Sequence, residues 1–348
     1  GHTRSATRPI GEPARIALLQ TYDGEIAKPS RLDRALARDN STWLRRRPPC
    51  RIDEIYFFAA AINREYALRH GYDFVQGRAD CRQTLQRHPS WCKLVVLKGL
   101  LWDAGASYDW VVQIDVDAVF NDGGLSIEAW LERGVPSGRA LPLREIAEDS
   151  CTWSQHGGDR LHSGCLVMGK DLARGINGGV VFAKRSRKLL RLLAAWWSWP
   201  LRGADGELDV RRRFELDFPY EQAALNGDAG VATSAEAACM RIVPARELFR
   251  PGYRIVHFTG PCRLDPRYER EDGRYREFGP TRKCLCLLSH FGAYIISRLS
   301  AAPDMKATRC RTRSVEVSPP EWPVGSNASG SWKRLAVDYT WHGCGATF

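Results

Sequence analysis

Residues 110–117 read WVVQIDVD, an almost wholly apolar run that ends in two aspartates, Asp115 and Asp117. A short apolar run rich in valine and isoleucine is typical of a buried strand. Two carboxylates at the end of such a strand can converge on one cation through a turn. Hard divalent ions such as Mn²⁺ or Mg²⁺ take carboxylate oxygens and keep positions open for phosphate oxygens. The stretch therefore predicts a strand with a divalent-metal site at its carboxyl end.

The chain before this stretch alternates between the two periodicities of helices and strands. Apolar runs at 15–20 and 72–75 indicate strands, and helical spacing of apolar residues covers 53–70 and 91–104. Strand–helix alternation predicts a mainly parallel sheet flanked by helices, which is an α/β fold. Ligands of such sheets gather at the carboxyl ends of the strands.

The second half of the chain is more mixed. We expect strands at 165–168, 179–182 and 254–258, an amphipathic helix over 188–199 and a helix that begins near Tyr220. Beyond about residue 300 the pattern breaks into Pro, Ser and Gly. The predicted organisation is a tail (1–14), one catalytic domain (15–300) and a cysteine-containing C-terminal extension (301–348).

Composition limits the classes of partner. The formal net charge is +11, yet Lys and Arg are spread along the chain, and the only tight runs are 45–47 and 211–213. No motif combines basic residues with interleaved aromatics, so we expect no nucleic-acid partner. A solvated basic surface explains the charge, and its field would also attract an anionic nucleotide.

Cysteines and sequons indicate the compartment. None of the 11 cysteines forms a paired C-x-x-C or zinc-like spacing, and five of them lie in the last quarter, where disulfides would staple a loop-rich end. Because the count is odd, at least one thiol is free or pairs with another chain. Sequons at Asn40 and Asn327 add to the cysteines in favouring an oxidising lumen or the cell exterior.

The sequence contains no apolar run of 18 residues and opens on Gly1 without an initiator Met. We expect the full-length protein to be a glycosylated type II membrane protein of the Golgi lumen or secretory pathway, with an anchor before Gly1. Nothing in the sequence indicates an oligomeric state.

Several blocks resemble glycosyltransferase family 34, which contains α-galactosyl-, α-mannosyl- and xyloglucan α-xylosyltransferases. Residues 63–72, NREYALRHGY, resemble its N-x-x-YA-x-x-HGY block, and the D-x-D at Asp115 and Asp117 follows at the matching interval. The other blocks appear in the family's order and resemble its W-x-K, N-T-G, D/E-Q-x-A-L and H-F-x-G elements: Trp91-Cys92-Lys93, Asn177-Gly178-Gly179, residues 221–225 and residues 257–260. Six blocks in order make the resemblance specific from about residue 15 to 264.

The resemblance implies a GT-A nucleotide-diphospho-sugar transferase fold, a divalent cation and retention of anomeric configuration. Carried over by position, Asp115, Asp117 and His257 would ligate the metal. Gln222 would lie near the anomeric carbon on the face opposite the leaving diphosphate. Glu221 would orient the acceptor or support Gln222. The ordinary alternatives are a core histidine for His257 and a helix N-terminal acid for Glu221.

Further residues would bind the donor and acceptor. The nucleoside would contact Thr21 and Tyr22, which follow the first strand. The diphosphate would contact Val116 in the D-x-D motif and Gly260 and Arg263 at the late H-F-x-G block. The sugars would contact the turn formed by Asn177, Gly178 and Gly179. The alternatives are packing for Tyr22 and a simple turn for Asn177 and Gly179. Asn63, Tyr66, His70 and Trp91 are interpreted as scaffold.

The chain departs from the family at three points. Val116 replaces the usual Ser or Ala, Gly178 replaces Thr, and Arg263 stands where many members place a Lys on the diphosphate. Arg263 could supply that positive charge bidentately. These differences suggest a distant member with its own acceptor, and we favour a UDP-linked hexose or pentose as donor.

Two other functions remain open. The letters from Asp115 to Val119 also match the D-x-D-x-[TV] opening of haloacid-dehalogenase phosphatases, in which Asp115 would be the nucleophile. More than 100 residues precede it here, whereas in that family the motif lies near the start of its domain. The chain could also be an inactive nucleotide- or carbohydrate-binding module.

Overall fold

The computed structural model describes residues 14–23, 52–85, 87–105, 108–121, 123–133, 164–171, 175–199, 213–215, 221–226, 231, 235–243, 248, 255–257, 309–320 and 334–342. The strands are β1 (Ile16–Asp23), β2 (Asp73–Ala79), β3 (Trp110–Ile114), β4 (Ala118–Phe120), β5 (Leu166–Asp171), β6 (Gly175–Lys184), β7 (Met240–Val243), β8 (Ile255–His257), β9 (Arg309–Val317) and β10 (Leu335–His342). The α-helices are α2 (Ile52–His70), α3 (Cys81–Leu85), α4 (Pro89–Lys98), α5 (Ile127–Arg133), α6 (Arg187–Ser198) and α8 (Glu221–Asn226). Short helical turns are η1 (Gly99–Asp103), η5 (Arg213–Glu215) and η7 (Ala235–Cys239).

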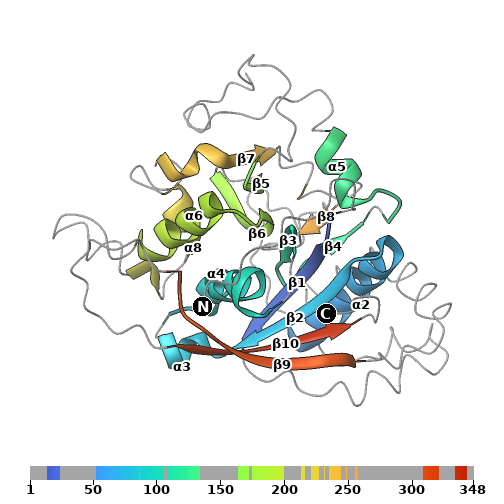
Figure 1. Ribbon diagram of the computed structural model, residues 1–348, viewed down its shortest axis with the longest axis horizontal. Coiled ribbons are helices and arrows are strands. Elements are labelled where there is room, and N and C mark those ends of the chain that lie inside the picture. Colours follow the sequence, from blue (N-terminus) through green and yellow to red (C-terminus); the bar gives the residue numbers. More distant parts are fainter. Residues whose placement is uncertain are drawn as a thin grey trace, which may run out of the picture.

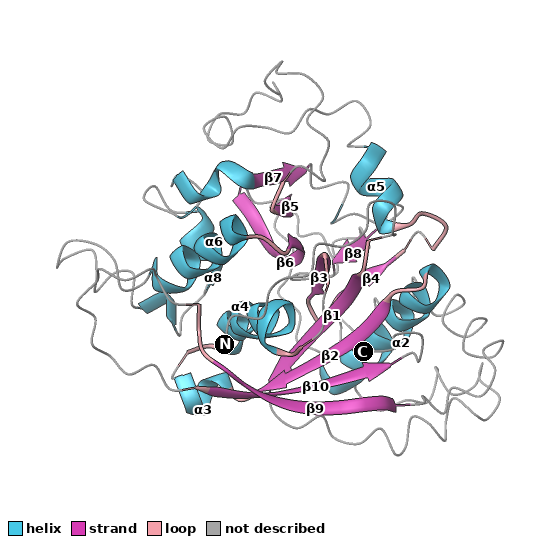
Figure 2. Cartoon of the chain, viewed as in Figure 1, coloured by secondary structure: helices cyan, strands magenta, loops and turns pink. Residues whose placement is uncertain are grey.

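One eight-stranded sheet runs through the molecule in the order β7-β5-β6-β3-β1-β2-β10-β9 (Figures 1 and 2). β1 pairs in parallel with β2 and β3, and β5 pairs in parallel with β7. β6 and β10 are antiparallel to both of their neighbours, so the other six strands of this sheet share one direction. The predicted fold class, a mixed and mainly parallel α/β sheet flanked by helices, is confirmed.

The alternation of side chains along β1 produces a core on each face of the sheet. Ala17 and Leu19 join the apolar cluster that includes α4 and α6, whereas Leu18 joins the cluster that includes α2 and α5. All three are fully buried. Because side chains alternate across a strand, a strand with helices on both faces has to be apolar throughout, and β1 and β3 almost are. Figure 1 shows α2 and α4 on opposite sides of β1 and β2.

The helix α4 begins with local signals that fix its position. The side chain of His88 accepts a hydrogen bond from the backbone N–H of Ser90, and Pro89 occupies the first turn, where its missing N–H is harmless. A disulfide between Cys81 and Cys92 ties the helix to α3. The helix then continues into the π-helical turn η1.

The C-terminal strands β9 and β10 were not predicted, and they extend the central sheet beyond β2 (Figure 1). Val337, Tyr339 and Trp341 on β10 are buried, and the Tyr339 hydroxyl donates to the carbonyl of Val96 on α4 at 2.7 Å. The described part of the predicted extension therefore packs as the last strands of the domain sheet.

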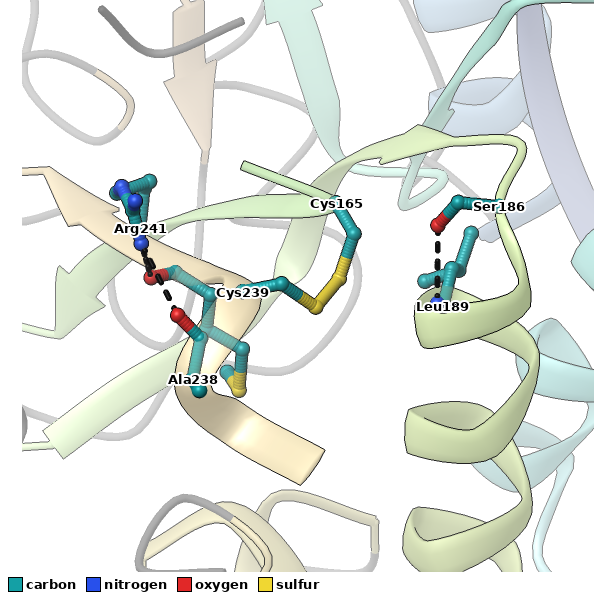
Figure 3. The surroundings of a disulfide bond; sticks show 7 residues. Cys165, Ser186, Leu189, Ala238, Cys239 and Arg241 are labelled. Atoms are coloured by element: carbon teal, nitrogen blue, oxygen red, sulfur yellow. Dashed lines mark hydrogen bonds between the residues drawn. A yellow bond between two sulfur atoms is a disulfide. The ribbon is translucent and has the colours of Figure 1, made fainter. Parts of the chain in front are cut away.

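A second disulfide joins Cys165, just before β5, to Cys239, just before β7 (Figure 3). The same two residues share a backbone hydrogen bond of 2.8 Å from Cys165 N to Cys239 O. This link fixes the start of the parallel pair at one edge of the sheet. Among the helices that the structure describes, none combines the length and apolar character needed to cross a bilayer.

Candidate metal and nucleotide-sugar site

The candidate site lies at the carboxyl end of β3, where four segments meet. Asp115 follows β3 directly, and its backbone N–H donates to the carbonyl of Gly179 on β6 at 2.7 Å. The Ala118 N–H donates back to the carbonyl of Asp115, which forms a turn that carries Asp117 and leads into β4. β4 pairs antiparallel with β8 in a small second sheet, so that Ala118 faces His257. The turn and this pairing bring His257 to the two aspartates.

The predicted metal ligands lie together. The Nε2 atom of His257 is 3.2 Å from Oδ1 of Asp117 and 3.9 Å from Oδ2 of Asp115. One ligand atom from each of the three residues lies within 4.8 Å of the other two. His257 is buried, while the Asp115 side chain keeps 28% of its surface exposed. Solvent therefore reaches this three-residue group at Asp115 and not at the imidazole of His257.

Hydrogen bonds determine which nitrogen of His257 carries the proton. The backbone N–H of Gly179 can only donate, and it lies 2.8 Å from Oδ1 of Asn177, which fixes the orientation of that amide. The same oxygen is 3.0 Å from Nδ1 of His257, so Nδ1 is the protonated nitrogen of the neutral ring. The lone pair of Nε2 then faces the two carboxylates. A divalent cation bound by all three residues would satisfy this arrangement, as would a proton on Nε2 that is donated to Asp117.

The residues present fit a divalent ion. Ligand atoms about 2.1 Å from an octahedral ion lie about 3 Å apart when adjacent and about 4 Å apart when opposite. The separations of 3.2 and 3.9 Å from Nε2 fall in this range. Two carboxylates and one imidazole suit Mn²⁺ or Mg²⁺ and leave positions for other oxygen ligands.

The glycine at 179 is required by the imidazole. A Cβ atom built on Gly179 would clash with the His257 ring, within 2.6 Å of Cε1, Nδ1 and Nε2. The sequence resemblance implied a sugar-pocket role for Asn177 and Gly179. In the structure both residues contact or border the His257 ring. Asn177 forms a hydrogen bond with its Nδ1 atom, and Gly179 lacks a side chain that would occupy the space of the ring.

A buried lysine connects this group to α8. The Nζ atom of Lys93 lies 3.1 Å from Asp115 Oδ1, 2.8 Å from Glu221 Oε1 and 3.0 Å from the carbonyl of Gly178. Burial alone would lower the pKa of the Lys93 ammonium, but the charges of Asp115 and Glu221 outweigh it and hold this pKa above its ordinary value. Lys93 is therefore the cation of a buried three-residue ion cluster.

Glu221 is the buried carboxylate of this cluster. Burial raises the pKa of its carboxyl group, the ion pair with Lys93 opposes that rise, and the charge of Asp115 adds to it. Its Oε2 atom is buried without a hydrogen-bond partner among the described residues. Gln222 follows on α8, and its Cγ atom would lie 3.3 Å from a Cβ built on Gly178. Glu221 and Gln222 thus stand beside Gly178, next to the metal group.

The remaining predicted site residues are described only in part. Thr21 is at the end of β1, and its Oγ1 atom accepts a hydrogen bond of 3.2 Å from Gln113 on β3. Val116 lies in the turn between Asp115 and Asp117 and packs against the apolar cluster of α2 and α5. The side chain of Tyr22, and the whole of Gly260 and Arg263, lie outside the described residues.

The scaffold interpretation of the first block agrees with the structure. The Asn63 amide donates to the Ala118 carbonyl and accepts from the Phe120 N–H, at 2.9 and 3.0 Å. The Tyr66 ring stacks on Phe120. Together these contacts hold β4, the strand that follows Asp117. Lys93 was part of the W-x-K block but was given no role; a single charge inside an apolar helix face was the signal that could have identified it.

Among known proteins, the chain is similar only in fold, to several solved structures. No protein-family model and no curated protein sequence matches the chain. A glycosyltransferase involved in glycosylation of the major capsid of PBCV-1 is 13% identical over 70% of this chain and 94% of its own, with a TM-score of 0.42. The galactosyltransferase LgtC, in complex with donor and acceptor sugar analogues, is 10% identical over 83% of this chain and 98% of its own, at 0.34. The glycosyltransferase GlyE of Streptococcus pneumoniae TIGR4 is 11% identical over 83% of this chain and 64% of its own, with a TM-score of 0.33. Values this low say nothing about the activity of this chain, which has to be inferred from its own site.

Proposed function

We propose that this chain is a retaining, divalent-metal-dependent glycosyltransferase with a GT-A fold. It would transfer a hexose or pentose from a nucleotide-diphosphate sugar, most simply a UDP-sugar, to a hydroxyl of a glycan or glycoconjugate. The observation that carries the proposal is the constrained imidazole of His257, whose Nε2 lone pair faces Asp115 and Asp117 at the open carboxyl end of a parallel strand. This combination suits a divalent cation, and the partly exposed Asp115 would let that cation bind an anionic ligand.

When bound, a divalent ion would supply positive charge for the diphosphate of the donor, both in binding and as it leaves. The residues Asp115, Asp117 and His257 would hold it. The same edge of the sheet carries Thr21 at the end of β1, where the nucleoside would lie. A deep basic patch is not needed for this role, because the ion neutralises the phosphates.

The sugar would lie against α8. Glu221 offers a buried carboxylate oxygen without a partner among the described residues, which would accept a hydrogen bond from a donor-sugar hydroxyl. Gln222 would stabilise positive charge that develops at the anomeric carbon through its amide oxygen. For retention, the acceptor hydroxyl would attack from the side of the departing diphosphate, and a diphosphate oxygen would take the acceptor proton.

The proposal includes the compartment. Two disulfides among the described cysteines are what an oxidising environment permits, and they support a lumenal or secreted location in the secretory pathway. Fractionation of cells that express the full-length protein would test this location, and recovery of the protein in the cytosol with reduced cysteines would contradict it.

A donor-hydrolysis assay tests the activity. The full chain would be incubated with Mn²⁺ and a panel of UDP- and GDP-sugars, with free sugar and nucleotide as products. We expect hydrolysis of at least one donor, lost in EDTA and lost in Asp117→Ala. The matched control is Asp103→Ala, which removes an aspartate paired with Lys98 away from the site.

The same samples separate the two other functions. Metal-dependent binding of UDP without turnover of any donor would indicate an inactive binding module. Trapping of a phosphoryl group on Asp115 would indicate the phosphatase. Either result would overturn the proposed transfer reaction.

A further inference from the structure

The ammonium of Lys93 sits between the metal group and the helix that carries the predicted sugar-facing residues. We propose that Lys93 is a positioning residue, which holds α8 at a fixed distance from the metal-binding end of β3. This role rests on the glycosyltransferase function proposed above. It concerns the transfer step itself and leaves metal binding to Asp115, Asp117 and His257.

Lys93 has no proton left for a substrate. An ammonium group offers three N–H donors. Its three partners come from three different segments: Asp115 Oδ1 after β3, the Gly178 carbonyl on β6 and Glu221 Oε1 on α8, at 3.1, 3.0 and 2.8 Å. The side chain is 5% exposed. Lys93 therefore acts on the reaction through the groups that it holds.

The backbone of β6 is shaped for this contact. On β5, Met168 pairs with Val181 and the next residue, Gly169, pairs with Asn177, so that residues 178–180 form a bulge. Bulges redirect groups near functional sites, and this one places the Gly178 carbonyl on Lys93 and the Gly179 carbonyl on the Asp115 N–H. Lys93 thus connects Asp115, at the end of β3, to the bulge of β6 that also leaves space for the His257 ring.

Each end of the connection is held by a further contact. Lys93 lies on α4, one residue after the disulfide-bonded Cys92. At the other end, the indole N–H of Trp196 donates to the Glu221 carbonyl at 2.8 Å. With the charge at position 93 removed, the carboxylates of Asp115 and Glu221 would be left close together without their shared cation, and they would repel each other. We expect the helix α8, which is only six residues long, to move away from Asp115.

The test compares Lys93→Met with Lys98→Met, a control on the same helix whose Nζ pairs with Asp103 at 2.7 Å. Mn²⁺ affinity is measured by electron paramagnetic resonance, UDP affinity by calorimetry, and kcat and KM with the donor found active for the wild type. We expect Lys93→Met to lose about 100-fold in kcat, the typical effect of a misplacement near 1 Å. Because Lys93 contacts Asp115, the Mn²⁺ affinity of this variant should also fall, by about tenfold or less, so kcat is measured at saturating Mn²⁺ and UDP; Lys98→Met should match the wild type throughout.

Three outcomes decide the proposal. A Lys93→Met enzyme with wild-type kcat would overturn it and leave the glycosyltransferase function intact. A folded variant whose kcat returns to the wild-type value at saturating Mn²⁺ would show that Lys93 acts only through metal binding and would also overturn it. A wild type that binds no Mn²⁺ and turns over no donor would remove the proposed function, and this role with it.

Should Lys93→Met fail to fold, Lys93→Arg replaces it. The guanidinium keeps the carboxylates paired, but its flat fork cannot reach the three partners of a compact ammonium. The expected pattern is the same, with kcat reduced by about tenfold or more at saturating Mn²⁺. Wild-type kcat in this variant would overturn the proposal.

Discussion

The neighbours of the proposed metal ligand His257 favour one orientation of its ring. Asn177 accepts from Nδ1 and Gly179 provides the space, while Nε2 faces Asp117. Neighbours of this kind typically change metal affinity about 10- to 100-fold when removed. Two substitutions beside the ring test whether it is held in this way.

The first prediction concerns Asn177. Asn177→Ala removes the acceptor of the Nδ1 proton, so we expect Mn²⁺ affinity to fall about 10- to 100-fold. Asn177→Asp keeps an acceptor oxygen in place and should retain the affinity. Titration of Mn²⁺ followed by electron paramagnetic resonance measures both. Equal affinities in Asn177→Ala and the wild type would show that this hydrogen bond does not orient the ligand.

The second prediction uses two adjacent glycines on β6. The methyl group of Gly179→Ala would clash with the His257 ring, so the ring has to move. Mn²⁺ affinity should then fall by at least about tenfold. A methyl group on Gly178 would instead meet Glu221 Oε1 at 3.0 Å and Gln222 Cγ at 3.3 Å. Gly178→Ala should therefore bind Mn²⁺ normally and transfer sugar more slowly. The opposite order of effects would contradict the geometry described for the two residues.

At the scale of elements, the local signals of the sequence were sufficient for most of the sheet and insufficient for the site. The apolar runs predicted β1, β2 and β3, because strands buried on both faces are apolar throughout. The three-residue strand β4 was not predicted, since nothing in a segment so short distinguishes it from a turn.

The strand β10 was also missed, although it carried a signal. Leu335, Val337, Tyr339 and Trp341 are buried and alternate with more polar residues, a period of two that predicts a strand. Its pairing with β2, more than 250 residues earlier in the chain, has no local signature. The pairing of Asp115 with Asp117 at a metal site was predicted from the strand end itself, whereas the approach of His257 was implied only by resemblance, because β4–β8 pairing brings it there.

The third prediction compares the two disulfides, which close loops of different length. The cysteines of Cys81–Cys92 are 11 residues apart, and those of Cys165–Cys239 are 74 apart. On the chain-entropy model the short loop contributes about 3 kcal/mol to the free energy of unfolding and the long loop about 4.5 kcal/mol. Denaturant unfolding of Cys81→Ser/Cys92→Ser and Cys165→Ser/Cys239→Ser would measure both. A larger loss in the first pair would indicate that native packing, and not loop length, sets the contribution.

At the scale of the whole molecule, the two ends of the described chain meet in one sheet. β1 near the N-terminus and β10 near the C-terminus both pair with β2 (Figure 2). Tyr339 and Trp341 belong to the same apolar cluster as α4, which carries Lys93. The C-terminal strands are therefore part of the support for the site.

The fourth prediction is a pair of truncations. A chain that ends at residue 308 loses β9 and β10 and exposes the edge of β2 with the apolar surface that Val337, Tyr339 and Trp341 cover. We expect it to be insoluble or to bind a hydrophobic dye. A chain that ends at His342 keeps both strands and should retain the folded state of the full chain, as measured by thermal unfolding. A stable, monomeric chain ending at residue 308 would show that β9 and β10 are dispensable.

The most direct test of the account is whether a histidine nitrogen coordinates the metal. Electron spin echo envelope modulation of the Mn²⁺-loaded protein with UDP detects coupling to a ligand ¹⁴N nucleus. We predict this coupling in the wild type and in Lys98→Met, and its loss in His257→Ala. Bound Mn²⁺ without nitrogen coupling, or a coupling that persists in His257→Ala, would contradict the assignment of Asp115, Asp117 and His257 as the metal centre.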